Sequence, residues 1–75
     1  MDKTDWAEEV KGLLKGELKR RNVSYQELAN RLEGVGVNES PANIANKISR
    51  GGFSAVFLIQ CMRVIGCQNL RLSDG

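Results

Sequence analysis

A chain of 75 residues forms one domain, 1–75, near the lower size limit at which a single apolar core suffices without disulfides or metals. Its 41% hydrophobic and 27% charged residues are an ordinary globular mixture, which excludes a disordered or membrane protein. No apolar run reaches the roughly 20 residues of a spanning helix, and the acidic, polar start MDKTDWAEEV is unlike a secretory signal, so we expect a cytoplasmic protein.

The cysteine and histidine content limits the metal chemistry. Cys61 and Cys67 are six residues apart, which is about 9 Å along a helix and beyond the ~7 Å limit for a disulfide. We therefore expect two reduced cysteines, with Cys61 as a small core residue. Because the chain has no histidine and no third cysteine, we expect no metal and no cofactor.

The first predicted helix runs from Asp5 to Arg21, and Asn22 is expected to cap it. Gly12 and Gly16 lie inside it, and each costs about 1 kcal/mol relative to alanine. We interpret these two glycines as sites of close helix approach. The apolar residues that recur at the spacing of one helical face are Trp6, Val10, Leu13, Leu14 and Leu18.

A second helix is predicted over Tyr25 to Glu33. Ser24 followed by Glu27 forms a capping box, in which each side chain satisfies a free amide of the first turn. Val23 and Leu28 flank this box as a hydrophobic staple. The residues expected to face the core are Leu28, Ala29 and Leu32.

The connection that follows, Gly34 to Glu39, has glycines where the chain must turn sharply and valines that can fold back onto the core. A third helix is predicted over Pro41 to Arg50, because proline at the first helical position loses no hydrogen bond and Gly51 can adopt the left-handed conformation that ends a helix. Ser40 precedes it. Its buried side is expected to hold Ile44, Ile48 and Ala45. Its opposite side holds Asn43, Asn46, Lys47 and Arg50.

A fourth helix is predicted over Ala55 to Ile65, with Ser54 at its start, Gly66 at its end, and Phe53 and Leu58 as a staple. Its apolar residues cover more than half the circumference. Such a helix is either the central element of the core or partly covered by a partner molecule. We favour both roles, and we expect a homodimer because so small a core is marginal alone.

The polar sector of this fourth helix is narrow, with Gln60 and Arg63 on either side of Val56. After it, the alternation of Leu70, Arg71 and Leu72 is compatible with a short strand or a last helical turn. The fold class is therefore all-α, a compact bundle of four or five short helices that contains a helix-turn-helix.

The net charge of +2 is unevenly distributed. Residues 11–21 carry five basic residues against Glu17, and residues 41–73 carry four basic residues and no acid. This pattern is consistent with a phosphate footprint. Lys19, Arg20 and Arg21 would equally complement the dipole of their own helix at its C-terminal end, so both readings stay open for these three.

Three short motifs carry a resemblance to a known family. They are Gln-Glu-Leu-Ala at residues 26–29, the Asn-rich third helix ending in Ser-Arg-Gly at 49–51, and the apolar fourth helix ending in Ile-Gly at 65–66. Over about residues 9–72 the chain resembles the lambda-repressor and Cro-like helix-turn-helix family. It looks most like a group of short uncharacterised bacterial domains within or near that family.

The resemblance implies that the third helix enters the major groove of double-stranded DNA while the start of the second touches the phosphate backbone. Asparagine can bond adenine and lysine can bond guanine or phosphate. The expected base contacts are Asn43, Asn46 and Lys47. The expected phosphate contacts are Gln26, Arg50, Lys19, Arg20 and Arg21. The predicted function is that of a small bacterial transcriptional regulator.

One departure from the family pattern opens an alternative. The family's turn has three or four residues, whereas Glu33 to Glu39 gives a connection of six or seven. A longer turn could instead make the third helix part of a protein-binding surface, and the polar residues on it also fit an ordinary solvated helix face. The alternative function is therefore a non-catalytic protein interaction or oligomerisation module on the same scaffold.

Catalysis is the function class that the sequence disfavours most. The chain lacks histidine, paired carboxylates on one helix face, and a glycine-rich phosphate loop after a strand. The Gly-Val-Gly of residues 34–36 is only a turn signal. We expect no enzyme activity.

Overall fold

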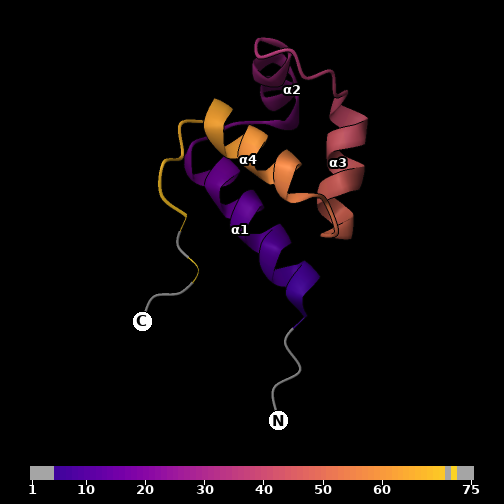
Figure 1. Cartoon of the computed structure of the whole chain (residues 1–75), viewed down its shortest axis with the longest axis vertical. Coiled ribbons are helices and arrows are strands. Elements are labelled where there is room, and N and C mark those ends of the chain that lie inside the picture. Colours follow the sequence, from indigo (N-terminus) through magenta and orange to yellow (C-terminus); the bar gives the residue numbers. More distant parts are fainter. Residues whose placement is uncertain (1–4, 71, 73–75) are drawn as a thin grey trace.

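The computed structural model describes residues 5–70 and 72, and these form four helices: α1 Trp6–Arg20, α2 Tyr25–Glu33, α3 Pro41–Arg50 and α4 Ala55–Val64. The predicted all-α class is confirmed, and the predicted helix ends agree to within one residue. In the view of Figure 1, α4 is seen between α1 and α3, although the end of α3 contacts the start of α1 directly, and α2 lies at the upper end. No helix of the described chain is long and apolar enough to cross a membrane.

Each helix begins at a side chain that accepts hydrogen bonds from its first turn. Ser24, Ser40 and Ser54 accept from the amides of α2, α3 and α4 at 3.0–3.1 Å. Asp5 does the same for α1, accepting from Ala7 and Glu8. Because these bonds join residues two or three positions apart, the helix starts could be predicted accurately from the sequence.

The capping box of α2 differs from its prediction in one half. The Ser24 hydroxyl accepts from the Glu27 amide at 3.1 Å as expected. The Glu27 carboxylate, however, accepts from Arg31 Nε at 2.9 Å, one helical turn further on. An i, i+4 ion pair with arginine is therefore the contact that this carboxylate makes.

Residues with left-handed backbone follow three of the helices. Gly51 and Gly66, predicted to end α3 and α4, have φ of 70° and 82°. Asn22 follows α1 with φ of 58°, a conformation that asparagine tolerates better than most residues. The chain can thus reverse direction immediately after each of these helices.

The core lies where the four helices meet. The predicted inward residues Leu28, Leu32, Ile44 and Ile48 are completely buried, and Ala29 is nearly so. The remaining buried apolar residues are Leu14, Leu18, Val23, Phe57, Cys61, Met62 and Ile65. Helix α4 supplies three of them, Phe57, Cys61 and Met62, as many buried residues as α2 supplies.

Trp6, predicted to lie on the apolar face of α1, is 70% exposed, so this prediction is wrong. At about 100° per residue, Trp6 lies roughly 80° around α1 from the buried Leu14. It also belongs to the first turn. The periodicity therefore included a position that the neighbouring helices do not cover.

The prediction that Gly12 and Gly16 mark close helix approach is also wrong. A Cβ added at either position would meet no atom within 4 Å outside its own helix. The close approach occurs at Gly51 instead, where a Cβ would lie 2.4 Å from the carbonyl oxygen of Ala7. Here the end of α3 contacts the start of α1.

The C-terminal end of α4 is held by two arginines. Arg21 Nε donates to the Ile65 carbonyl at 3.1 Å, and Arg31 Nη1 donates to the Val64 carbonyl at 3.2 Å. The last carbonyls of a helix lack intrahelical partners and carry partial negative charge, so a guanidinium group stabilises them. These bonds fasten α1 and α2 to the end of α4.

After α4 the described chain contains no strand or fifth helix. Leu70 and Leu72 are exposed. Arg71, the middle residue of the predicted alternation, lies outside the described residues, as do residues 73–75.

Substituting Gly51 by alanine should destabilise the fold by roughly 3 kcal/mol, because the new side chain would clash with Ala7 and strain a left-handed backbone. Gly12→Ala is the matched control. It adds the same methyl group inside a helix with open space around it, so it should stabilise by about 1 kcal/mol. Urea unfolding followed by circular dichroism measures both. Equal midpoints for Gly51→Ala and the wild type would contradict this close contact.

Candidate nucleic-acid interface

The exposed side of α3 is the candidate interface. Asn43, Asn46 and Arg50 are all exposed, whereas Ile44 and Ile48 on the opposite side are completely buried. At about 100° per residue, the three polar residues fall within a sector of roughly 60°. The structure therefore brings together two of the three predicted base contacts and one predicted phosphate contact.

Small side chains border this sector. Ala42 and Ser49 are exposed on α3 next to Asn46. The Ser49 hydroxyl donates to the Asn46 carbonyl at 3.5 Å, so it stays close to its own helix. The exposed side of α3 therefore carries mostly short side chains, and Arg50 is its one long side chain.

Lys47, the third predicted base contact, already binds other groups of the protein. Its ammonium group pairs with the Glu39 carboxylate and lies 4.8 Å from the centroid of the Phe57 ring. The Lys47 side chain is 43% exposed and that of Glu39 only 13%. This pair could not be predicted from the sequence, because Glu39 precedes α3 at a spacing for which no helical rule predicts contact.

The connection between α2 and α3 is closed by its own backbone. The amides of Val35 and Val37 both donate to the Leu32 carbonyl, at 3.0 and 2.9 Å, and Gly36 adopts a φ of 84°. Val37 packs against the core as predicted, but Val35 is exposed. Seven residues, Gly34 to Ser40, separate the two helices, which is the long turn that the sequence predicted.

Gln26, the predicted phosphate contact on α2, is exposed in the first turn of that helix. Its amide nitrogen donates to Asn30 Oδ1 at 3.2 Å, one turn further along. This bond leaves the Gln26 amide oxygen and its second N–H group without a described side-chain partner.

The basic residues at the end of α1 lie apart from the exposed side of α3. Lys19 is about 18 Å along α1 from Ala7, the residue that contacts the end of α3 at Gly51. Lys19 and Arg20 are exposed, and Arg20 Nη1 lies 3.6 Å from Glu17 Oε2. The structure does not gather the two groups of predicted phosphate contacts into one patch.

Arg21, the last of these predicted phosphate contacts, already binds two other groups of the protein, although the residue is exposed. It pairs with the buried Glu17 and donates to the Ile65 carbonyl. Of the two readings left open for this residue, the structure favours the stabilisation of a helix end, but the end belongs to α4 rather than to α1.

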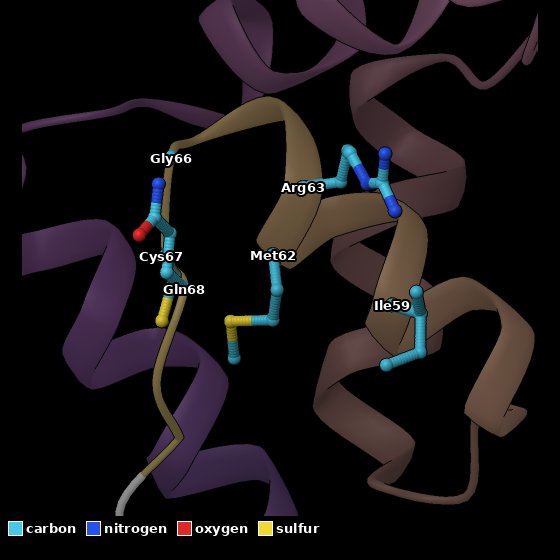
Figure 2. Close-up of a pocket in the computed structure, with 6 residues that line it drawn as sticks. All are labelled: Ile59, Met62, Arg63, Gly66, Cys67 and Gln68. Carbon is cyan, nitrogen blue, oxygen red and sulfur yellow. The ribbon is translucent and has the colours of Figure 1, made fainter.

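Two open depressions flank α4. One is lined by Lys47, Arg50, Gly52, Phe53, Ser54 and Phe57, where the end of α3 meets the start of α4. The other, with a volume of 440 Å³, lies between α4 and the segment after it. Figure 2 shows the Met62 side chain extending toward that segment and Arg63 pointing away.

The second depression is lined by one thiol and one guanidinium group among apolar and amide groups. Its lining residues are Ile59, Met62, Arg63, Gly66, Cys67 and Gln68. None of these is a carboxylate that could act as a general acid or base. Among the described residues, no three carboxylate, histidine or cysteine side chains come together as a metal site would require.

Both cysteines are free thiols, and Cys61 is completely buried. Burial raises the pKa of the Cys61 thiol from 9.0 to about 12, with a further rise from the Glu39 carboxylate and an opposing effect of the Lys47 ammonium. A buried neutral thiol is a poor nucleophile, because the thiolate is the reactive form. Cys61 therefore serves the core, as the sequence predicted.

Taken together, these features define an all-α domain of four capped helices, in which the exposed face of α3 carries mostly short, polar side chains. The chain belongs to the family described as "Domain of unknown function (DUF6471)", whose sequence model matches residues 6–70. Searches of the curated proteins and of the solved structures returned no match. The family description assigns no activity and no link to the lambda-repressor and Cro-like proteins.

Cys61 should react with iodoacetamide at pH 8 about a thousandfold more slowly than an unperturbed thiol, because its raised pKa lowers the thiolate fraction by that factor. Cys67, which is only partly buried, is the internal comparison. Peptide mass spectrometry after timed labelling should find modification of Cys67 first and of Cys61 only in urea. Rapid labelling of Cys61 in the folded protein would contradict its burial.

Proposed function

We propose that this domain binds double-stranded DNA without catalysis, as a small bacterial transcriptional regulator that places α3 in the major groove. The observation that carries the proposal is the exposed sector of α3, in which Asn43, Asn46 and Arg50 lie together on a helix that has no acidic residue. An asparagine amide can bond adenine N6 and N7 in a bidentate manner. The resemblance to lambda-repressor and Cro-like proteins supports the same assignment.

The shape of α3 also supports the proposal. A helix with its side chains is about 10–12 Å across, and the major groove is about 12 Å wide. The small exposed side chains of Ala42, Asn43, Asn46 and Ser49 would let the helix backbone approach the base edges closely. Longer side chains would hold it further from the floor of the groove.

The composition of α3 further favours a selected function over a neutral surface. Asparagine is a weak helix former, and Asn43 and Asn46 both lie within a helix of ten residues. Neither is needed by the core, since both are exposed. Selection for stability alone would favour stronger helix formers at these two positions.

The candidate phosphate contacts differ in whether their side chains already bind another group of the protein. Arg50 makes no ion pair with any carboxylate in the described part of the chain, and it adjoins the two asparagines. Gln26 is a second candidate at the start of α2. Lys19 and Arg20 would require a duplex that also reaches the far end of α1.

A second function, self-association through α4, is favoured by a separate observation. Val56 is 65% exposed and Ile59 is 60% exposed on the same side of that helix. A second copy of the chain is the occupant that we propose. If two α4 helices packed antiparallel about Ile59 and Gln60, the two Arg63 charges would stay about 10 Å apart along the axis. Gln60, which can both donate and accept, would meet its equivalent.

The DNA-binding proposal predicts salt-sensitive binding that depends on Arg50. Fluorescence anisotropy with pooled genomic duplexes at about 50 mM salt should detect complex formation, which weakens steeply as salt rises. Arg50→Glu should reduce the affinity at least about tenfold, because it removes a phosphate contact and introduces repulsion.

Lys15→Glu is the matched control for this variant, because it makes the same change of charge on the exposed side of α1. It should cause a much smaller loss. Equal losses for the two variants would mean that only the net charge matters and would contradict an interface on α3. No salt-sensitive binding by the wild type would refute the proposal itself.

The self-association proposal predicts that Ile59→Glu converts a dimer into a monomer, because a charge would be buried without a partner. Val35→Glu is the matched control, since Val35 is also exposed but lies in the connection between α2 and α3. Light scattering coupled to size exclusion should give a dimer for the wild type and for Val35→Glu. A wild-type chain that is already monomeric at about 100 μM, which is weak by the standards of specific association, would rule this proposal out.

A further inference from the structure

The ion pair between Glu39 and Lys47 joins the α2–α3 connection to α3 itself. Glu39 is the residue before the Ser40 cap, and its side chain is only 13% exposed. Lys47 lies two turns along α3, and its ammonium group reaches back to the Glu39 carboxylate. The Glu39 carboxylate thus binds the lysine that the sequence pattern assigned to DNA contact.

A second contact holds Lys47 on the side of α4. Its ammonium group lies over the Phe57 ring, 4.8 Å from the centroid, where the face of the ring carries partial negative charge. The ammonium group therefore contacts both the carboxylate and the aromatic ring, although the Lys47 side chain is partly exposed. Arg50, one turn further along α3, lines the same depression as Lys47 and Phe57 but is exposed.

We propose that Glu39 is a specificity-determining residue, which binds Lys47 in the free protein in place of a phosphate group. This inference rests on the proposed DNA-binding function. A duplex gains the Lys47 contact only by separating it from Glu39. Non-specific DNA therefore binds through Arg50 and leaves Lys47 unused.

The burial of Glu39 explains why a phosphate contact alone is not enough to separate Lys47 from Glu39. Separating the pair leaves a carboxylate largely shielded from water and without its cation, which is strongly unfavourable. One phosphate contact in a hydrated interface contributes little binding free energy by comparison. Only a site whose bases also bond Asn43 and Asn46 would supply enough additional binding to separate Lys47 from Glu39.

A purely structural role for the pair makes different predictions. If Glu39 only fastened the connection to α3, its neutral variant would alter stability and leave the number of phosphate contacts unchanged. The slope of log affinity against log salt reports that number, because each neutralised phosphate contributes about 0.9 to it. The salt slope is therefore the measurement that separates the two roles.

The experiment uses the full chain and a random-sequence duplex of 24 base pairs as the probe, with anisotropy measured between 25 and 200 mM KCl. Glu39→Gln should bind several-fold more tightly, and its salt slope should be steeper by about 0.9 as Lys47 becomes available to a phosphate. Lys47→Gln alone should leave the wild-type slope unchanged. The double variant should also have the wild-type slope.

Glu33→Gln is the matched control for charge. It removes one negative charge from an exposed position at the end of α2 that makes no ion pair within the described residues, so its salt slope should equal that of the wild type. Circular dichroism establishes that each variant is folded. Should Glu39→Gln not fold, the unchanged slope expected of Lys47→Gln still tests the proposal.

A wild-type slope that falls by about 0.9 in Lys47→Gln would overturn the inference, because Lys47 would already contact a phosphate. An unchanged slope in a folded Glu39→Gln would overturn it as well. Either result leaves the DNA-binding proposal standing. If neither the wild type nor Glu39→Gln binds the duplex at 25 mM KCl, both proposals fail together.

Discussion

The contact between Gly51 and Ala7 is the constraint from which the position of α3 follows. No side chain fits between these two residues, and the left-handed turn at Gly51 directs the chain into α4 immediately afterwards. The Lys11 ammonium group, 3.4 Å from the Ser49 carbonyl, strengthens the same junction. With its last turn fixed against α1 and its first turn capped by Ser40, α3 has little freedom to rotate. The direction in which its polar side faces is therefore set by the fold.

The features that could be predicted from the sequence are those determined within a few residues. The starts of α2, α3 and α4 depend on a serine and the amide three residues later, and Ile44 and Ile48 share a face by helical geometry alone. The features that could not be predicted depend on neighbours distant in sequence. The exposure of Trp6 and the open space at Gly12 reflect which parts of α1 the other helices cover, and periodicity does not contain that information.

The charge distribution illustrates the same limit for the candidate interface. Counting lysines and arginines overstates the surface available to phosphate, because the structure uses several of them internally. Arg21 and Arg31 hold the end of α4, Lys11 bonds the end of α3, and Lys47 binds Glu39. What remains on α3 is mainly amide chemistry with one arginine beside it. In the proposed complex, these amides would read the bases through hydrogen-bond geometry, and the arginine would supply the electrostatic attraction to phosphate.

The separation between the two sides of α3 has a consequence for how such a domain can change over evolutionary time. Ala42, Asn43, Asn46 and Ser49 contribute nothing to the core, so substitutions there leave the packing of Ile44 and Ile48 intact. These outer positions are exposed and lie outside the core, so substitutions there act on stability mainly through helix propensity, by less than about 1 kcal/mol each for residues other than glycine and proline. In the proposed DNA-binding role, substitutions at these positions would change the target while the same scaffold is kept, so recognition and folding would be inherited as separate traits.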